Sequence, residues 1–476
     1  MPTINRRHLI IHISFLLTLG LASCKPTGSE QKTTAIAKLT IRYMNENKPD
    51  SVYLLFGETL RKQIPVVRWA SIYKKQISGL LPLKNLSLVS WKDSIGIYKV
   101  TGKIPLQIMF GNLDKDGKMN TFAALSSTET AKKTHKVATD NKLINHLDST
   151  VDKVVSTYIQ TKGNVGVSTG VLYKGKSYFY NYGERKMDTK SLPDNHTLYD
   201  IGSITKTFTS TLLALAVHQQ KLTLETSITK FLPDSVAENP ALQKITFKEL
   251  ANHTSGLPRD ADNLGATVID ANQPYGNYKV KDLFSLLKHF KQTTVPGVKY
   301  GYSNLGVGLI GVLFERIYDK SYQELLRQYI TLPLKMNETM CSIDSTKFSN
   351  LAQGYNSFSQ PVPFYHLQAV EAAGAIKSST FDLITYAKAQ LFSSSPTLDT
   401  AIKLIHQVTF DKKPDIVGLG WYYLPDNKNV MTHTGGTGGY LSSICIDLSR
   451  QIAVVILTNN TNTGHSLGNN LITAIH

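Results

Sequence analysis

The sequence predicts an α+β protein in two parts: a small α+β domain, followed by a longer segment with a sheet assembled from both of its ends and a helical lobe between them. Residues 143–476 carry strand-like runs at both ends and a mostly helical stretch between them. Residues 33–127 show helical periodicity first and strand-like alternation afterwards. Residues 128–142 are polar, basic and without periodicity, which predicts a linker between the two parts. The chain of 476 residues is 41% hydrophobic, enough for a sizeable core.

The first residues are typical of a secretory signal. Arg6 and Arg7 precede an apolar run over residues 9–22, which is too short to cross a bilayer of about 30 Å as a helix. Leu21-Ala22-Ser23-Cys24 resembles a lipobox, in which small residues precede a cysteine that is acylated after cleavage. We therefore expect a lipoprotein signal over residues 1–23, lipidation of Cys24 and a tether over residues 24–32. Such a protein is exported and anchored in a membrane of the cell envelope. An ordinary signal peptide with an incidental cysteine is the alternative.

The front part, residues 33–127, has the pattern of a small α+β domain. Helices are expected over residues 33–45, 50–56 and 62–79, and strands over residues 86–92, 95–101, 106–113 and 118–125. The Asp114-Lys115-Asp116-Gly117 stretch favours a hairpin turn over a calcium loop, because the later calcium ligands are missing. The order of elements resembles the cone-shaped NTF2-like domains that precede catalytic domains in some bacterial lipoproteins. Nothing in this part indicates catalysis, so a spacer and a partner-binding module are both open interpretations.

Charge and cysteine content limit the partners. The net charge is +17, of which residues 1–142 carry +13 and residues 143–476 carry +4. A basic surface can indicate nucleic acid, but in an exported lipoprotein it favours contact with anionic lipid or an envelope polymer. We therefore expect no nucleic-acid partner. Cys341 and Cys445 could form a disulfide in an oxidising compartment, although two buried thiols are the preferred interpretation.

In the second part, the elements predict a sheet built from both ends of the segment. Late strands would lie beside early ones, and the cleft would form where the sheet meets the helical lobe. A helix is expected over residues 143–159, and an amphipathic helix over residues 207–220 follows the stretch that contains Ser203. The expected strands cover residues 165–173, 177–182, 418–424, 430–433, 440–447 and 452–458, and a terminal helix covers residues 467–476.

Ser203 and Lys206 are the candidate reacting pair. A β-prone run ends at Gly202, and Ser203 is expected in the first turn of the helix that follows. Residues three apart on a helix share a face, and a buried lysine can lose its proton and activate a hydroxyl. The pattern alone does not choose this serine, because Ser-x-x-Lys also occurs at Ser29, Ser71, Ser227 and Ser285.

Two further motifs follow in order. In Tyr302-Ser303-Asn304, a phenol and an amide two residues apart could face one site, the phenol to relay a proton and the amide to hold a substrate carbonyl. The same pattern occurs at Tyr43 and Tyr275. His433-Thr434-Gly435-Gly436 ends a late strand, where glycines allow close approach of a ligand to the backbone.

The order Ser203-x-x-Lys206, Tyr302-x-Asn304, His433-Thr434-Gly435 resembles the serine β-lactamases and penicillin-binding-protein-like hydrolases, especially the class C branch. Residues 246–258, 296–315, 372–383 and 418–440 share the likeness. The resemblance implies a β-lactamase/transpeptidase-like fold over residues 143–476, with an antiparallel sheet flanked by helices and an all-helical lobe. It also implies a structural turn at Ser227.

The same resemblance implies a role for each site residue. Ser203 would be acylated, and Lys206 with Tyr302 would move its proton, with either of the two as the base. Asn304 would orient the substrate, and the N–H groups of Ser203 and Gly436 would hold the oxyanion. Thr434 and Gly435 would line the strand edge along which the substrate lies.

His433 departs from the family pattern, in which lysine usually supplies a fixed positive charge for a substrate carboxylate. Histidine is mostly neutral at pH 7 and is familiar in esterase-like and aminopeptidase-like relatives. We expect a serine hydrolase that acts on amides or esters, namely a β-lactam, a D-amino-acid peptide or an ester, without metal or cofactor. A non-catalytic penicillin-binding or sensing lipoprotein is the alternative, and a packing role for His433 is another. The other histidines, His253 and His366 among them, lack metal spacing and are interpreted as structural.

Overall fold

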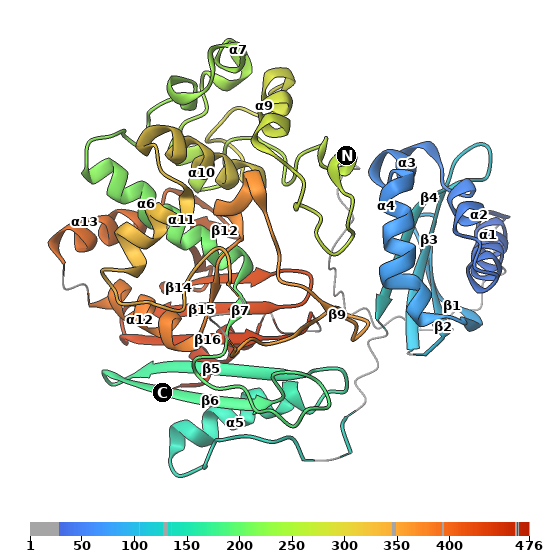
Figure 1. Ribbon diagram of the computed structural model, residues 1–476, viewed down its shortest axis with the longest axis horizontal. Helices are drawn as coiled ribbons and strands as arrows, with labels where there is room; N and C mark the ends of the chain where they lie inside the picture. Colours follow the sequence, from blue (N-terminus) through green and yellow to red (C-terminus); the bar gives the residue numbers. More distant parts are fainter. Residues whose placement is uncertain are drawn as a thin grey trace. The chain divides into compact units, whose positions relative to one another are not determined.

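The computed structural model describes residues 28–103, 105–126, 132–134, 136–344, 349–392, 395–461, 464 and 466–475. The chain divides into two compact units, residues 1–129 and 130–476, and each is described by itself (Figure 1). The predicted signal and Cys24 lie outside the described residues. No helix within the described residues is both long and apolar enough to cross a membrane.

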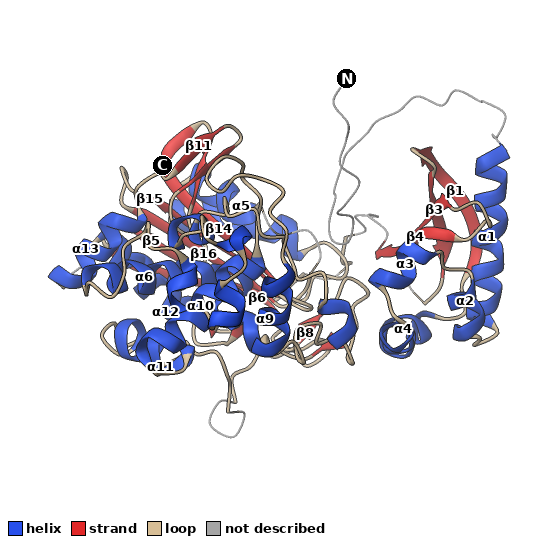
Figure 2. Ribbon diagram, turned by 90° about the horizontal axis from the view of Figure 1, so that it is seen from above, coloured by secondary structure: helices blue, strands red, loops and turns tan. Residues whose placement is uncertain are grey.

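The described part of the first unit packs one long helix and three short ones around a four-stranded antiparallel sheet (Figure 2). Buried side chains alternate along β2 (Ile95–Thr101) and β3 (Pro105–Leu113). The Phe122 ring of the sheet lies 5.8 Å from the rings of both Phe56 and Trp69, which lie 4.9 Å apart. The predicted hairpin at Asp114 is confirmed, because its N–H donates to the Lys118 carbonyl over 2.9 Å. The elements are α1 (Gly28–Asn45), α2 (Pro49–Leu54), α3 (Glu58–Gln63), α4 (Val66–Ile72), β1 (Lys84–Lys92), β2 (Ile95–Thr101), β3 (Pro105–Leu113) and β4 (Met119–Ser126).

Two predictions for this unit are wrong in detail. Helix α1 begins at Gly28, so the expected tether over residues 24–32 is helical in its described part. The helix expected over residues 62–79 is interrupted at Pro65, which lacks an N–H and lies between α3 and α4. After Ile72 this stretch continues as a π-helical turn and then a 3-10 turn.

The second unit contains an eight-stranded antiparallel sheet in the order β11-β12-β13-β14-β15-β16-β5-β6. Strand β16 pairs with β5, so the last strand of the chain lies beside the first strand of this unit, as predicted (Figure 1). The strands are β5 (Gly166–Tyr173), β6 (Lys176–Gly183), β11 (Phe410–Lys412), β12 (Asp415–Val417), β13 (Tyr422–Leu424), β14 (Asn427–Gly436), β15 (Leu441–Asp447) and β16 (Ile452–Thr458). The predicted strand over residues 418–424 is shorter than expected, and β11 and β12 were not predicted.

Helices cover both faces of this sheet. On one face α5 (His146–Ile159) and α14 (Leu467–Ala474) pack on alternate side chains of β5 and β16, such as Val167 and Val454. On the other face α12 (Thr380–Leu391) and α6 (Thr205–His218) join the core of the helical lobe. The predicted fold class, an antiparallel sheet flanked by helices with a helical lobe, is confirmed.

The helical lobe lies between β7 (Tyr199–Asp200) and β11 in the sequence. It is centred on α10 (Asn304–Tyr318), which is buried over most of its length. The remaining helices of this unit are α7 (Asp234–Ala237), α8 (Phe247–Ala251), α9 (Val280–His289), α11 (Tyr322–Leu326) and α13 (Pro396–Ile405). Three further short strands are β8 (Gly354–Tyr355), β9 (Pro361–Val362) and β10 (Lys377–Ser378).

Two other expectations concern the unit boundary and the cysteines. The later part of the expected linker, residues 128–142, belongs to the second unit, because Gly183 donates from its N–H to the Ala138 carbonyl over 2.8 Å. The described part of that segment is therefore attached to the edge of β6. Cys341 and Cys445 are buried free thiols, so the disulfide alternative is excluded.

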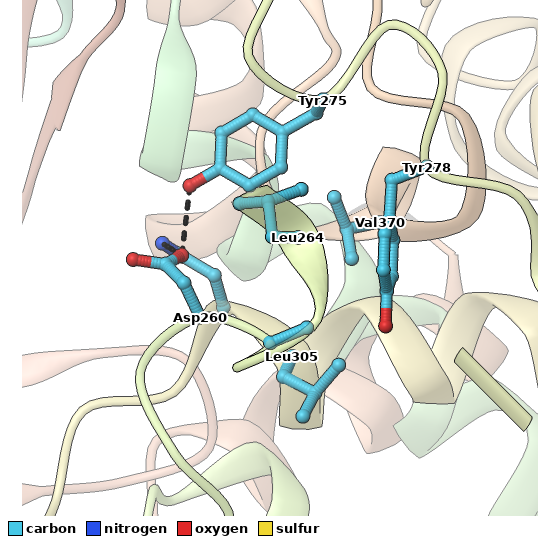
Figure 3. Close-up of a pocket in the computed structure, with 8 residues that line it drawn as sticks. Asp260, Leu264, Tyr275, Tyr278, Leu305 and Val370 are labelled. Atoms are coloured by element: carbon cyan, nitrogen blue, oxygen red, sulfur yellow. Dashed lines mark hydrogen bonds between the residues drawn. The ribbon is translucent and has the colours of Figure 1, made fainter. Parts of the chain in front are cut away.

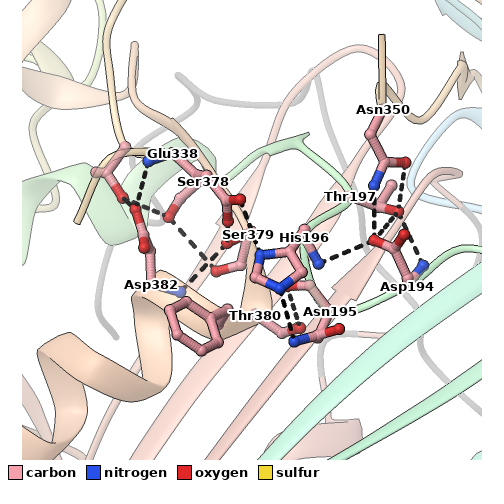
Figure 4. A network of polar contacts seen from close by, with 12 residues as sticks. Asp194, Asn195, His196, Thr197, Glu338, Asn350, Ser378, Ser379, Thr380 and Asp382 are labelled. Atoms are coloured by element: carbon pink, nitrogen blue, oxygen red, sulfur yellow. Dashed lines mark hydrogen bonds and ion pairs between the residues drawn. The ribbon is translucent and has the colours of Figure 1, made fainter. Parts of the chain in front are cut away.

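A polar network holds the segment before β7 against the segments around β10 and α12 (Figure 4). The His196 ring nitrogen Nδ1 lies 2.8 Å from the Glu338 carboxylate, and Asp382 accepts from the Glu338 N–H over 2.8 Å. Burial raises the pKa of Asp382 to about 6. This network fixes the position of the strand that leads directly into the Ser203 turn.

Candidate active site

Ser203 lies in a 3-10 turn, Gly202–Ile204, immediately before α6 rather than inside its first α-helical turn. Gly202 adopts φ +49°, and a Cβ there would lie 2.7 Å from the Gly436 nitrogen at the end of β14. Only glycine permits both the conformation and this close approach. The turn is held from the other side by Ser442, whose hydroxyl donates to the Ile201 carbonyl over 2.7 Å. The Ser203 side chain is thereby presented beside the end of the sheet.

The structure brings Lys206 and Tyr302 together around Ser203. Lys206 Nζ lies 3.1 Å from Ser203 Oγ, and the Tyr302 hydroxyl lies 2.7 Å from the same oxygen. Lys206 Nζ also lies 4.9 Å from the centre of the Tyr302 ring. Three side chains from two distant segments therefore form one contact group.

Lys206 is fully buried and is held by two carbonyl oxygens. Its amine donates to the Ala373 carbonyl over 2.7 Å and to Asn304 Oδ1 over 2.9 Å. Burial first and the neighbouring Arg259 second lower the pKa of Lys206 well below its usual value. Burial raises the pKa of Tyr302. Both effects favour the neutral forms of the two side chains.

Asn304 connects Lys206 to a pair of charged residues. Asn304 Nδ2 donates to Asp260 Oδ1 over 2.8 Å, which fixes the amide with its oxygen toward Lys206. Arg259 precedes Asp260, and its guanidinium lies 4.7 Å from the centre of the Tyr302 ring. The Arg259 carbonyl accepts from the Asn304 N–H over 2.8 Å. Segment 258–260 therefore holds the start of α10 in place.

Two buried histidines lie in the aromatic wall beside Tyr302. The His253 ring lies 4.5 Å from the Tyr302 ring, and the His433 ring lies 5.2 Å from the Tyr422 ring. Burial and then Lys206 lower the pKa of His433 to about 3, and the same two causes lower the pKa of His253. The His433 ring is therefore neutral at the position where the resembling family usually has a charged lysine.

The hydrogen bonds of these histidines define their tautomers. His433 Nδ1 lies 2.7 Å from the Thr434 carbonyl, which can only accept, so Nδ1 carries the proton. His253 Nδ1 accepts from the Ser303 N–H over 3.2 Å, so the proton is on Nε2. Both Nε2 atoms are buried without a protein hydrogen-bond partner among the described residues.

The structure also separates Ser203 from the repeated motif at Ser227. Ser227 caps a 3-10 turn and donates to the Gln243 carbonyl over 2.9 Å, while Lys230 is exposed. No hydrogen bond joins these two side chains in the described structure. Ser227 is therefore a structural turn residue.

Sequence reasoning missed several neighbours of Ser203. His253 was interpreted as structural, yet its ring contacts Tyr302. Arg259 and Asp260 directly follow the stretch over residues 246–258 that carried the family likeness, and an adjacent opposite-charge pair there was the available signal. The Ala373 contact could not be predicted from the sequence, because every residue has a backbone carbonyl. Within the described residues, no group of three or more His, Cys, Asp or Glu side chains is arranged to hold a metal ion.

The fold and this contact group define a class of protein in which a serine, a lysine and a tyrosine meet where an antiparallel sheet adjoins a helical lobe. The sequence model of the β-lactamase family matches residues 151–474, more than half of the chain. The chain therefore belongs to the β-lactamase family.

Relatives support this assignment at moderate identity. A β-lactamase of Pseudomonas fluorescens is 27% identical over 348 residues, which cover 65% of this chain and 92% of the relative. The D-alanyl-D-alanine-carboxypeptidase/endopeptidase AmpH of Escherichia coli K12 is 26% identical and covers 65% of this chain and 83% of its own length. The crystal structure of a β-lactamase/D-alanine carboxypeptidase from Pseudomonas syringae shares the fold with a TM-score of 0.62 at 24% identity, covering 70% of this chain and all of that one. Together these relatives place the chain among the serine hydrolases in general.

Proposed function

We propose that this protein hydrolyses amide or ester substrates through an acyl-enzyme on Ser203. The observation that carries the proposal is the pair of contacts to Ser203 Oγ, from Lys206 Nζ at 3.1 Å and from the Tyr302 hydroxyl at 2.7 Å. A hydroxyl needs a base to become a nucleophile, and a neutral amine at hydrogen-bond distance supplies one.

The contacts of Lys206 favour this residue as the base. A neutral amine has two N–H groups and one lone pair. The carbonyl of Ala373 and the amide oxygen of Asn304 accept the two N–H groups, which leaves the lone pair for the Ser203 proton. Tyr302, whose pKa is raised, remains a phenol and relays a proton to the leaving group.

The reaction then has two halves. In acylation, Ser203 Oγ bonds to the substrate carbonyl carbon, the bond from that carbon to the leaving nitrogen or oxygen breaks, and the serine proton passes through Lys206 and Tyr302 to the leaving group. In deacylation, water adds to the acyl carbon, the ester bond to Ser203 breaks, and one water proton returns to the Ser203 oxygen. The N–H groups of Ser203 and Gly436 would hold the oxyanion in both halves, and removing one such donor typically costs about 10² to 10³ in kcat.

The neutral His433 bears on the substrate. Without a fixed cation at this position, a substrate carboxylate gains less than it would from lysine. Envelope peptides or esters therefore rank at least level with β-lactams as substrates, with Thr434 and Gly435 along the edge of the substrate site. The covalent sensor, which acylates and excludes water, is the second candidate.

The experiment uses residues 25–476 with a labelled penicillin and with p-nitrophenyl acetate. We expect label or turnover in the wild type and in Ser227→Ala, which removes the matched Ser-x-x-Lys serine. Ser203→Ala should lose both, since removing such a nucleophile costs about 10⁶ in kcat. Labelling without turnover would favour the sensor. Activity that survives in Ser203→Ala would refute the acyl-enzyme on this residue.

We also propose export and anchoring through lipid on Cys24, without a nucleic-acid partner. The support is the Arg6-Arg7 start, the apolar run and the Leu21-Ala22-Ser23-Cys24 stretch. Palmitate labelling and membrane fractionation of cells should find the wild type in membranes and Cys24→Ala released. Equal membrane retention of both would contradict the anchor.

A further inference from the structure

Asp260 lies two hydrogen bonds from Lys206, through Asn304, and the proton-transfer steps above do not use it. Its Oδ1 accepts from Asn304 Nδ2 over 2.8 Å and from the Tyr275 hydroxyl over 2.7 Å. The Asp260 carboxylate is therefore held against the side-chain amide of Asn304, which in turn contacts the Lys206 amine.

The second oxygen of Asp260 retains most of its acceptor capacity. Among the described residues, Oδ2 contacts Arg259 Nε at 3.8 Å, which is beyond normal hydrogen-bond length. The Asp260 side chain is 31% exposed, so a ligand can reach it, yet it is shielded enough for a charge contact to matter. Oδ2 is the free anionic acceptor next to Asn304.

Arg259 does not occupy the same position. Its guanidinium lies on the Tyr302 ring, where cation–π attraction holds it, and its side chain is 48% exposed. It therefore screens Asp260 only in part. On the His433 side of the site there is no fixed cation, since that ring is neutral.

The wall beside Asp260 is closed. Figure 3 shows the Tyr275 hydroxyl directed at Asp260 and the side chains of Leu264, Leu305 and Val370 lining the adjacent crevice. This crevice leaves no space for a water molecule. A substrate group that binds Asp260 therefore does so at the exposed part of the carboxylate and not inside this crevice.

We propose that Asp260 is a specificity-determining residue that binds a protonated amine on the acyl part of the substrate. The carboxylate then selects substrates with a free amino group beside the scissile carbonyl over substrates in which that nitrogen is acylated. The inference rests on the proposed Ser203 acyl-enzyme and names the substrate class of that site.

The test compares alanine p-nitroanilide with N-acetyl-alanine p-nitroanilide, in both enantiomers, at pH 7, where the α-amino group is mostly protonated. Each compound is measured as a substrate and as a competitive inhibitor of p-nitrophenyl acetate hydrolysis. We expect the wild type to prefer the free amine. In Asp260→Asn, the ratio of kcat/KM or of 1/Ki between the two compounds should fall about 10- to 100-fold, because a charged hydrogen bond is lost.

Asp262→Asn is the matched control, because Asp262 is an exposed aspartate two residues further along and its replacement removes the same charge. It should keep the wild-type ratio. The preference should also fade as pH rises above about 8, where the amine loses its proton. The assignment would be overturned if kcat/KM and 1/Ki in the wild type were the same for the free and the acetylated compound. It would also be overturned if their ratio were the same in Asp260→Asn as in the wild type.

Two further outcomes identify what has failed. If the wild type shows no ester hydrolysis that depends on Ser203, the proposed function itself is refuted. If the wild type hydrolyses the ester through Ser203 but does not prefer the free amine, only the role of Asp260 is refuted. A preference for N-succinyl-alanine p-nitroanilide that disappears in Arg259→Gln would assign recognition to the cation instead and would also overturn the proposal.

Discussion

At the scale of single residues, two opposite charges lie beside the groups that move the Ser203 proton. Arg259 lowers the pKa of Lys206 and of Tyr302, while Asp260 raises both. Neither charge touches Ser203 in the described structure. The two residues are adjacent in sequence and carry opposite charges. Variants that remove one charge or the other should therefore shift the pKa of the base in opposite directions.

We predict that Arg259→Gln and Asp260→Asn shift the acid limb of kcat/KM in opposite directions. The base works in its deprotonated form, so the rate rises as pH passes through its pKa. Removing Arg259 raises that pKa and moves the rise to higher pH, whereas removing Asp260 lowers that pKa and moves the rise to lower pH. The sign is the same whether Lys206 or Tyr302 is the base.

The measurement is the pH dependence of kcat/KM for p-nitrophenyl acetate, a neutral substrate that isolates the effect on the base. Asp262→Asn is again the charge-matched control. Shifts in the same direction for both variants would contradict the electrostatic explanation.

His433 gives a second prediction at this scale. Replacing it with lysine introduces a longer amine in β14, and a substrate carboxylate that binds beside this amine favours its protonated form and gains an ionic contact. We expect kcat/KM for benzylpenicillin, relative to p-nitrophenyl acetate, to rise about tenfold in His433→Lys. The neutral variant His433→Asn should not show this gain. A ratio equal in both variants would mean that this position does not contact the carboxylate.

At the scale of elements, the Ser203 turn is held by a buried ion pair between two short strands. Strand β7 pairs with β10, and Lys377 Nζ lies 3.6 Å from Asp200 Oδ1 with both side chains almost fully buried. Lys377 also donates to the carbonyls of Cys341, Tyr365 and Ala375. Burial raises the pKa of Asp200. The pair therefore joins the segment before Ser203 to the segment after Ala373.

We predict that Lys377→Met lowers the free energy of unfolding by about 3 to 5 kcal/mol, because it leaves the Asp200 carboxylate buried without its cation. The double variant Asp200→Asn/Lys377→Met should lose less than the sum of the two single variants, since neither charge is then left alone.

Urea unfolding measures these differences. Lys403→Met removes an exposed lysine from its ion pair with Asp399 and should cost at most about 1 kcal/mol. Strict additivity in the Asp200–Lys377 cycle would show that the pair is not energetically coupled.

At the scale of the whole molecule, every residue of the candidate site lies in the second unit, residues 130–476. That unit has its own sheet and two large hydrophobic clusters. The first unit has a separate sheet of four strands. A domain with its own core can fold alone.

We predict that residues 130–476, produced alone, hydrolyse p-nitrophenyl acetate with kcat/KM within about threefold of residues 25–476. The Ser203→Ala variant of the short protein is the blank. A soluble but inactive short protein would show that the first unit contributes to catalysis.

Much of the fold was predictable, because it depends on local pattern. The predicted strands over residues 95–101 and 452–458 begin and end at the same residues as in the structure. Their sequence pattern is enough to indicate a half-buried or buried strand. Boundaries failed where single residues decide them, as at Pro65, and where short strands such as β11 carry too few residues to show a period.

The sequence by itself determined the family and the order Ser203, Lys206, Tyr302, Asn304 and His433, because these motifs depend on short spacings. The family resemblance already assigned Ser227 to a structural turn, and the tertiary structure adds the physical reason: Ser203 contacts Lys206 and Tyr302, whereas Ser227 donates to the Gln243 carbonyl. Only the tertiary structure placed Asp260, Arg259 and His253 beside Tyr302, and supplied the Ala373 carbonyl to Lys206. Those contacts join segments far apart in the chain, and the burial that shifts the pKa of Lys206 is produced by all of them together, so no local pattern encodes it.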